Sequence, residues 1–326
     1  MRIGIIYGGL GIERKYNRDS LEQICSILQK HKIDYLIISL NKKINFRNIK
    51  KCNLFFVIDS NTNNVYRKIR LFKYIYDNSI DFIGQREEVL RILRDKHYTN
   101  QILNNNNILT TFSTLSNVMQ RDLKYPIIIK DNYGSSSEDV YLVFNNNEKE
   151  IASDKILKHN KIPLFEEYVV GREFTCVFLQ ICGLTIIMNP IEIKYNGLFY
   201  DYNAKNLELD SQVLTDPVLS KKSVKNIKNI TNLSNKYLHT QFYSRLDLKL
   251  NKQVATVIEM NGEPALSADD FVALGFYQLG FNYEDLIFGL LANSEIFKNF
   301  IKINRKKLNK RVKYISDRLS SFCLDK

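Results

Sequence analysis

Short apolar runs separated by amphipathic stretches fill the first 84 residues of the chain. Arg2–Tyr7 and Leu54–Ile58 are continuous apolar runs, which are typical of parallel strands buried on both faces. Ile33–Leu40 and Ile80–Gly84 have the same character, and the last of these runs ends at a glycine. This pattern predicts a small sheet of parallel strands.

Two amphipathic stretches lie between these runs. Ser20 and Gln23 have the spacing of a capping box, so they predict a helix that begins near Ser20 and continues with apolar residues at helical spacing. Val65–Tyr76 predicts a second helix. Because strands that alternate with helices form β-α-β units, residues 1–84 are expected to be an N-terminal α/β domain.

The pattern changes after this first unit. Residues 86–106 are expected to be helical, and Ile127–Ile129 and Val140–Phe144 predict two strands. The stretch between them, Asn132–Ser137, is small and polar. A loop of this kind between two strands predicts an antiparallel hairpin. We assign residues 85–165 to a central α+β domain and residues 166–326 to a second, larger one.

Several long strands dominate the larger α+β part of the chain. The spacing of its apolar residues predicts one helix before a final hairpin, followed by further helices. The helix covers Ser223–His239, and the strands cover Pro163–Val169, Glu173–Gln180, Thr185–Ile193, Ser244–Leu250 and Ala255–Met260.

The final hairpin carries the strongest chemical signal. Arg245 and Asp247 share one face of its first strand, and Glu259 and Asn261 share one face of the second, because side chains alternate along a strand. The short connection around Lys252 places Asp247 within a residue or two of the position opposite Glu259. Carboxylate and amide oxygens are ligands that Mg²⁺ prefers. The hairpin therefore holds either a magnesium site or a pair of surface acids.

Charge and composition exclude several classes of protein. The chain has 47 Lys and Arg residues against 35 Asp and Glu, which gives a net charge of +12. Its one dense basic block, Lys302–Lys313, lies in a helical stretch and is typical of a solvated face, so no nucleic-acid partner is predicted. No apolar run approaches the ~20 residues of a membrane span. The first residues predict a strand rather than a signal peptide.

The cysteines and histidines indicate no covalent or zinc framework. The 5 cysteines are scattered and never have CxxC spacing, and the 4 histidines form no ligand pair. This usage predicts reduced thiols rather than disulfides or a structural zinc site. We therefore expect a cytoplasmic protein without a membrane partner.

A series of motifs runs through nearly the whole chain in a fixed order. It comprises Gly8-Gly9 with Ile12-Glu13-Arg14, Asp95-Lys96, Pro126–Lys130 with Gly134–Ser137, Glu166 with Gly171–Thr175, Phe199–Lys205, Asp210–Gln212, Arg245–Asp247 and Glu259–Asn261. With these motifs the chain resembles the D-alanine–D-alanine ligases, which are ATP-grasp carboxylate–amine ligases. The resemblance implies a mixed α/β and α+β structure with an ATP-grasp fold, in which the N-terminal parallel-sheet domain and two α+β domains enclose ATP.

The resemblance also implies how ATP is held. The lysines would contact phosphate oxygens, one of them from a loop that closes over the phosphates, and the glutamates would accept from the adenine amine and the ribose hydroxyls. The glycine–serine tip would cover the phosphates through backbone N–H groups. The implied ATP-binding residues are Lys96, Lys130, Gly134, Ser135, Glu166, Glu173 and Lys205.

The same resemblance implies a metal site that coincides with the hairpin cluster. Asp247, Glu259 and Asn261 would hold two Mg²⁺ ions, with Mn²⁺ as an alternative. A carboxylate of the first substrate would attack the γ-phosphate, and an amine would then attack the acyl phosphate. Arg245 would stabilise the oxyanion that forms in the second step.

The remaining implied residues bind the small-molecule amino acid, carboxylate and amine substrates. Glu13 would hold the ammonium of the first amino acid. The catalytic serine is Ser136 in an ungapped alignment, whereas a one-residue gap would select Ser135. The family tends to form homodimers, so a homodimer is the implied assembly.

Three departures from the family pattern concern the substrates. Asn206 replaces a tyrosine that orients the serine, and Ala265 replaces a glycine whose N–H helps the oxyanion. Asp270 replaces a serine that binds the carboxylate of the second substrate, and two carboxylates at ~4 Å repel by about 1–4 kcal/mol. Our first interpretation is a ligase whose second substrate is not D-alanine. The alternatives are a true D-alanine–D-alanine ligase of peptidoglycan precursor synthesis and a nucleotide-binding pseudoenzyme.

Overall fold

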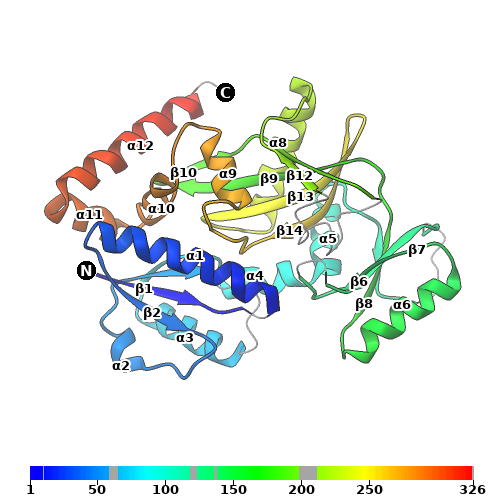
Figure 1. Ribbon diagram of the computed structural model, residues 1–326, viewed down its shortest axis with the longest axis horizontal. Coiled ribbons are helices and arrows are strands. Elements are labelled where there is room, and N and C mark those ends of the chain that lie inside the picture. The colour runs from blue at the N-terminus through cyan, green and yellow to red at the C-terminus, as the bar shows by residue number, and fades with distance from the viewer. Residues whose placement is uncertain (10, 59–64, 118–122, 136–137, 198–210, 325–326) are drawn as a thin grey trace.

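The computed structural model describes residues 1–326 apart from residues 10, 59–64, 118–122, 136–137, 198–210 and 325–326. Three sheets dominate the described residues, and they follow one another along the chain (Figure 1). The first sheet is parallel and the other two are antiparallel, as the sequence predicts. The domain limits at residues 84 and 165 stay a prediction.

The first sheet has the strand order β2-β1-β3-β4, and all of its pairs are parallel. Successive side chains of a strand point to opposite faces, so the buried residues of this sheet pack alternately against the helices on its two sides. Ile3 and Ile5 lie in one core with α1, whereas Phe55 and Val57 lie in another with α3. The elements are β1 (Arg2–Tyr7), α1 (Gly11–Lys30), β2 (Asp34–Ser39), α2 (Phe46–Ile49), β3 (Leu54–Ile58), α3 (Val65–Asp77) and β4 (Asp81–Ile83).

The prediction that the first helix begins near Ser20 is wrong, because α1 already begins at Gly11. Ser20 lies inside the helix, where its hydroxyl donates to the carbonyl of Tyr16 at 2.9 Å. The same hydroxyl accepts from the backbone N–H of Leu266 at 3.1 Å, and Gln23 Oε1 accepts from that of Ala268 at 2.7 Å. The two residues therefore bind a distant loop rather than start a helix.

The second sheet has the order β5-β8-β6-β7. The predicted β6–β7 hairpin is confirmed, with Ile127 opposite Val143. The helical stretch before this sheet is divided at Asp95, whose side chain accepts from the N–H of Tyr98 at 3.0 Å and so caps a new helix. The elements are α4 (Glu87–Arg94), α5 (Lys96–Asn105), β5 (Ser113–Thr114), β6 (Ile127–Asp131), β7 (Val140–Val143), α6 (Asn146–Lys158) and β8 (Pro163–Glu167).

The third sheet has the order β12-β11-β9-β13-β14, with β10 paired to β9. The single strand predicted at Thr185–Ile193 is wrong, because the structure divides it into β10 and β11. Pro190 lies in the gap, and proline cannot donate to a strand ladder. The predicted final hairpin is confirmed. The strands are β9 (Arg172–Ile181), β10 (Leu184–Ile187), β11 (Ile191–Tyr195), β12 (Ser211–Leu214), β13 (Tyr243–Asn251) and β14 (Val254–Asn261).

The C-terminal helices join the first and third sheets in one core. This core contains Ile3 and Ile5 of β1 together with Val177 and Leu179 of β9. None of the described helices has both the length and the apolar character needed to cross a membrane. The helices of this part are α8 (Lys221–Tyr237), α9 (Phe271–Tyr277), α10 (Tyr283–Leu291), α11 (Glu295–Asn304) and α12 (Lys306–Leu324).

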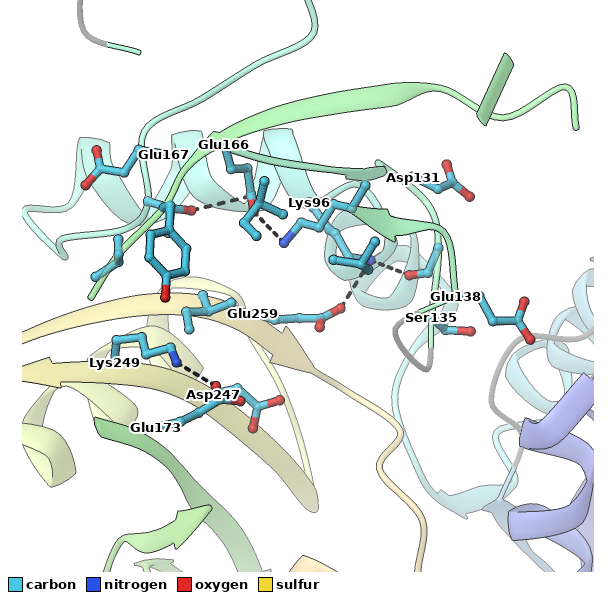
Figure 2. Close-up of a pocket in the computed structure, with 18 residues that line it drawn as sticks. Lys96, Asp131, Ser135, Glu138, Glu166, Glu167, Glu173, Asp247, Lys249 and Glu259 are labelled. Carbon is cyan, nitrogen blue, oxygen red and sulfur yellow. Dashed lines mark hydrogen bonds and ion pairs between the residues drawn. The ribbon is translucent and has the colours of Figure 1, made fainter. Parts of the chain in front are cut away.

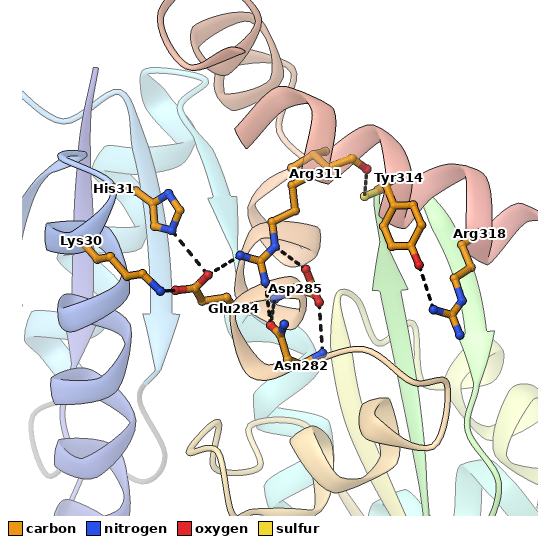
Figure 3. A network of polar contacts seen from close by, with 10 residues as sticks. Lys30, His31, Asn282, Glu284, Asp285, Arg311, Tyr314 and Arg318 are labelled. Atoms are coloured by element: carbon orange, nitrogen blue, oxygen red, sulfur yellow. Dashed lines mark hydrogen bonds and ion pairs between the residues drawn. The ribbon is translucent and has the colours of Figure 1, made fainter. Parts of the chain in front are cut away.

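A polar network connects α12 to α10 and to the end of α1 (Figure 3). Arg311 of α12 pairs with Glu284 and with Asp285 of α10. Lys30, the last residue of α1, pairs with the same Glu284. Burial alone would raise the pKa of Glu284, but Lys30 and Arg311 outweigh it and lower that pKa. The network therefore fixes the basic C-terminal helix α12 against α10, and α10 against α1.

We expect Arg311→Met to lower the free energy of unfolding by about 1–3 kcal/mol, because two partly buried carboxylates lose a charged partner while the stem is kept. Urea unfolding followed by circular dichroism measures this change. Lys313→Met on the exposed face of α12 is the control, with an expected change of less than about 0.5 kcal/mol. Equal effects of the two substitutions would show that the network does not stabilise the fold.

Candidate active site

A cleft lies between the second and third sheets, and Figure 2 shows side chains that enter it from both walls. One wall is built from β6, β7, β8 and the start of α5, and the other from β9, β13 and β14. The cleft brings together eight of the residues predicted from sequence. They are Lys96, Lys130, Gly134, Ser135, Glu166, Glu173, Asp247 and Glu259.

A buried ion pair occupies the β6–β8 wall. Ile128 lies opposite Glu166, so Lys130, two residues further along β6, projects from the same face as Glu166. The Nζ of Lys130 lies 2.6 Å from Glu166 Oε2, and the two side chains are 8% and 3% exposed. Burial alone would lower the pKa of Lys130, but the carboxylates of Glu166 and Glu259 outweigh it and raise that pKa. Lys130 is therefore a fixed positive charge in the cleft.

The other oxygen of Glu166 also has partners within the chain. Glu166 Oε1 accepts from Asn100 Nδ2 and from Thr111 Oγ1, both at 3.4 Å. Glu166 is buried and thus holds Lys130 in place. Its implied contact with the adenine amine stays a prediction.

Lys96 connects the two walls of the cleft. It is the first residue of α5, and its Nζ lies 3.1 Å from Glu259 Oε1 on β14. The same ammonium donates to the carbonyl of Gly134 at the tip of the β6–β7 hairpin. Lys96 therefore places a second positive charge between the hairpin tip and the carboxylates of the third sheet.

The acidic cluster of the β13–β14 hairpin forms as the strand alternation predicts. Asp247 lies directly opposite Glu259, and Arg245 lies opposite Asn261. Arg245 Nε is 3.0 Å from Asp247 Oδ1, and Asn261 Nδ2 donates to Asp247 Oδ2 at 2.9 Å. Burial opposes the charge of Arg245, yet Asp247 and Asp270 raise its pKa. All four side chains therefore lie on one face of the hairpin, and Asp247 and Glu259 line the cleft.

The donor set of this cluster suits a divalent ion that completes its shell with phosphate and water. Two carboxylates and an amide oxygen are hard ligands, and Mg²⁺ uses one or two carboxylates together with substrate phosphates. The described residues contain no group of three Asp, Glu, His or Cys side chains that would form a closed metal cage. In the structure Lys96 and Arg245 balance the charges of Glu259 and Asp247.

Sequence reasoning missed Lys249. It lies two residues beyond Asp247 on β13, so strand alternation already places it on the same side as Arg245 and Asp247. Its Nζ is 2.9 Å from Glu173 and donates to the hydroxyl of Tyr195, which in turn donates to Glu173 at 3.0 Å. Burial and the Glu173 carboxylate raise the pKa of Tyr195. Lys249 thereby fixes one oxygen of Glu173 at the floor of the cleft.

Several predicted residues fall outside the description. Ser136, Lys205 and Asn206 lie outside the described residues. Glu13 lies in the first turn of α1, beyond the end of β1, and its side chain is not among those described. Their roles stay predictions.

The two remaining predicted residues follow β14. Ala265 belongs to the loop that joins β14 to α9 and does not line the cleft. Asp270 is the N-cap of α9, and its Oδ1 accepts from the N–H of Phe271 at 2.7 Å. Burial raises the pKa of Asp270 to about 6, although the nearby Arg245 lowers it. Asp270 therefore becomes ionised at a higher pH than an ordinary aspartate.

The fold and the site together define a class of protein. Two antiparallel sheets that face each other across a cleft, with lysines on one wall and carboxylates on the other, form an ATP-grasp fold, as the resemblance implies. A family model described as "D-ala D-ala ligase C-terminus" matches residues 96–292. The chain belongs to this D-alanine–D-alanine ligase family.

Individual relatives match nearly the whole chain. The D-alanine–D-alanine ligase B of Clostridium perfringens is 25% identical over 309 residues, which are 91% of this chain and 100% of the relative. The ATP-complexed D-alanine–D-alanine ligase of Bacillus anthracis matches with a TM-score of 0.75 at 18% identity, over 92% of this chain and 99% of that one. The VanG D-Ala:D-Ser ligase of Enterococcus faecalis matches with a TM-score of 0.72 at 18% identity, over 89% and 98%.

Proposed function

We propose that this protein is an ATP- and Mg²⁺-dependent D-alanine–D-alanine ligase. The main support is the convergence of Lys96 and Lys130 from one wall with Asp247 and Glu259 from the other in a single cleft. Positive groups that bind phosphates and acids that bind a divalent ion are the two halves of a phosphoryl-transfer site. The named relatives favour this substrate assignment over our first interpretation of a different second substrate.

The proposed reaction has two steps. A carboxylate oxygen of the first D-alanine attacks the γ-phosphorus of ATP, the bond to the bridging oxygen breaks, and ADP leaves. The amine of the second D-alanine then attacks the carbonyl carbon of the acyl phosphate. Collapse of the resulting oxyanion expels phosphate, and the nitrogen loses a proton to leave the new peptide bond.

The described residues divide this work between the two walls. Lys96 and Lys130 bind phosphate oxygens, and their carboxylate partners keep both ammonium groups in place before ATP arrives. Asp247, Glu259 and Asn261 would hold Mg²⁺, which offsets charge on the transferred phosphate. Arg245 is held by Asp247 and would donate to the oxyanion of the second step.

The decisive experiment incubates purified protein with ATP, Mg²⁺ and D-alanine and follows both ADP and products by mass spectrometry. We expect ADP and D-alanyl-D-alanine in equal amounts, and the homodimer that the resemblance implies is checked on the same sample by light scattering. ATP binding without turnover, for D-alanine and for a matrix of other amino acids and amines, would instead support a pseudoenzyme.

A second candidate function keeps the same chemistry with a different acceptor. It is favoured by Asp270, a buried carboxylate close to Arg245. Burial raises the pKa of Asp270, and the positive charge of Arg245 lowers it by a smaller amount. An ionised Asp270 beside the acceptor site would repel the carboxylate of a second D-alanine and attract an amine that lacks one. ADP release with such an amine, and not with D-alanine, would support this candidate.

Asp270 gives a prediction about pH. Asp270→Asn keeps the helix cap but removes the charge, so at pH 8 the KM for the second D-alanine should fall by about tenfold. The wild-type KM should rise as the pH passes through about 6, whereas the variant should show no such rise. Initial rates of ADP release between pH 5 and pH 8 measure both effects.

Stability supplies an independent check on Asp270. Its folded pKa of about 6 lies above the ordinary aspartate pKa of 3.8, so the folded state binds more protons between these values and loses stability as the pH rises through them. Asp270→Asn should therefore raise the melting temperature at pH 8 more than at pH 4. A variant with unchanged KM and unchanged pH dependence would contradict a role for Asp270 at the acceptor.

A further inference from the structure

The loop after β14, residues 262–268, is attached to the first sheet's helices. It begins directly after Asn261, a proposed metal ligand, and contains Ala265, a predicted backbone donor to the oxyanion. Its position therefore bears on both. The backbone N–H groups of Leu266 and Ala268 donate to Ser20 and Gln23 of α1. Its position is therefore set from outside the third sheet.

A buried ion pair makes the third attachment. Lys68 of α3 is 0% exposed, and its Nζ lies 3.4 Å from Glu263 Oε2 and 3.5 Å from Oε1. The side chain of Glu263 is 6% exposed, so both charges are shielded from water. A buried charge that loses its partner is costly, which ties the position of Glu263 closely to that of Lys68.

Close packing restricts the loop on its other side. A Cβ placed on Gly262 would come within 2.4 Å of Leu93 Cδ1 on α4. The loop therefore runs against α4 with no space for a side chain at this position. Helix α4 and the ion pair thus restrict the loop from two sides, so we expect a change at Lys68 to move the residues next to Asn261.

We propose that Lys68 and Glu263 are positioning residues for catalysis. Through the loop of residues 262–268 they fix the position of Asn261, so helix α3 beside the first sheet helps to complete the active site between the second and third sheets. The inference rests on the proposed ligase function for its kinetic consequences. Its structural consequence, an ordered loop that depends on the Lys68–Glu263 pair, is testable without turnover.

Four single variants test the proposal in the full-length protein. Glu263→Gln and Lys68→Met remove one charge each, and Lys68→Arg keeps the cation. Lys73→Met is the matched control, because Lys73 lies on the same helix, is 73% exposed and pairs with the exposed Asp77. Glu263→Gln is the mildest change and keeps the test valid should Lys68→Met fail to fold.

We expect Glu263→Gln and Lys68→Met to lower kcat by about 10- to 100-fold, the scale of a small misplacement of reacting groups. The KM for ATP should stay within about twofold, because the proposed phosphate-binding Lys96 and Lys130 lie on α5 and β6 rather than in the loop, while Lys68→Arg should restore most of the kcat. Hydrogen exchange should become faster at the amides of Leu266 and Ala268 in both charge-removing variants, but not in Lys73→Met.

The outcomes separate the two hypotheses. A wild-type protein without any ligase turnover would overturn the proposed function, and the exchange rates at Leu266 and Ala268 would then decide the inference alone. Charge-removing variants that melt at a lower temperature but keep wild-type kcat and wild-type loop exchange would overturn the inference. In that case the ion pair only stabilises the fold.

Discussion

Asp247→Asn is expected to reduce the rate of ADP release by about 10²–10³-fold, the usual cost of removing one preorganised charged group from a transition state. Asparagine has nearly the same shape, so it still reaches Asn261 and Arg245. It lacks the negative charge that would hold a divalent ion, and it leaves Arg245 with less charge compensation. The loss should therefore appear in turnover much more than in folding.

A Mg²⁺ titration distinguishes metal binding from a general effect of charge. If Asp247 is a ligand, the variant should need a higher Mg²⁺ concentration for its residual activity, and its melting temperature should no longer rise when Mg²⁺ and ADP are added together. Asp77→Asn is the control, because Asp77 is 56% exposed and lies on the outer helix α3. An Asp247→Asn variant with more than half of the wild-type rate would refute the metal assignment.

The second large effect concerns the buried pair of Lys130 and Glu166. Lys130→Met should raise the dissociation constant for ATP by about 10²-fold or more, since a fixed phosphate-binding cation is lost. It should also destabilise the protein by about 3–5 kcal/mol, because Glu166 becomes a buried charge without its cation. Isothermal titration with ATP and urea unfolding measure the two effects separately.

A double-variant cycle separates binding from stability at this pair. Lys130→Met combined with Glu166→Gln should regain most of the lost stability, because no unpaired charge remains, but it should not regain ATP affinity. Lys124→Met, an exposed lysine just before β6, is the control for loss of positive charge. Recovery of ATP affinity in the double variant would contradict the assignment of Lys130 to the phosphates.

The regular elements were largely predictable because their apolar periods are strong. The parallel strands of the first sheet and both antiparallel hairpins appear where the patterns place them. The errors arose where a local pattern has two physical meanings. Ser20 and Gln23 have capping-box spacing, yet a serine inside a helix also bonds to the carbonyl four residues earlier, and Ser20 does so.

From the residue pattern alone, the site was predictable only where residues close in sequence share a face, whereas cleft residues such as Lys96 and Lys130 came from the family resemblance. Strand alternation brought Arg245, Asp247, Glu259 and Asn261 together, and the same alternation indicates Lys249. The pairing of Lys68 with Glu263 spans 195 residues and has no local signal, since one lysine among 47 basic residues has no distinguishing feature. Such contacts depend on how the first sheet packs on the third, which a single sequence does not reveal.

The second sheet, β5-β8-β6-β7, has a small core of its own, which affects how it can move relative to the third sheet. Among the described residues, this sheet packs around Ile127, Ile129, Ile156 and a few neighbours that form a cluster separate from the larger cores. Moving it away from β13 and β14 would break the bond from Lys96, whose helix α5 shares a core with the third sheet, to the carbonyl of Gly134 at the β6–β7 tip. The backbone bonds between residues 109–111 and Val257 join the start of this sheet to the third sheet, so a rotation about this point would open the cleft and leave the small core intact.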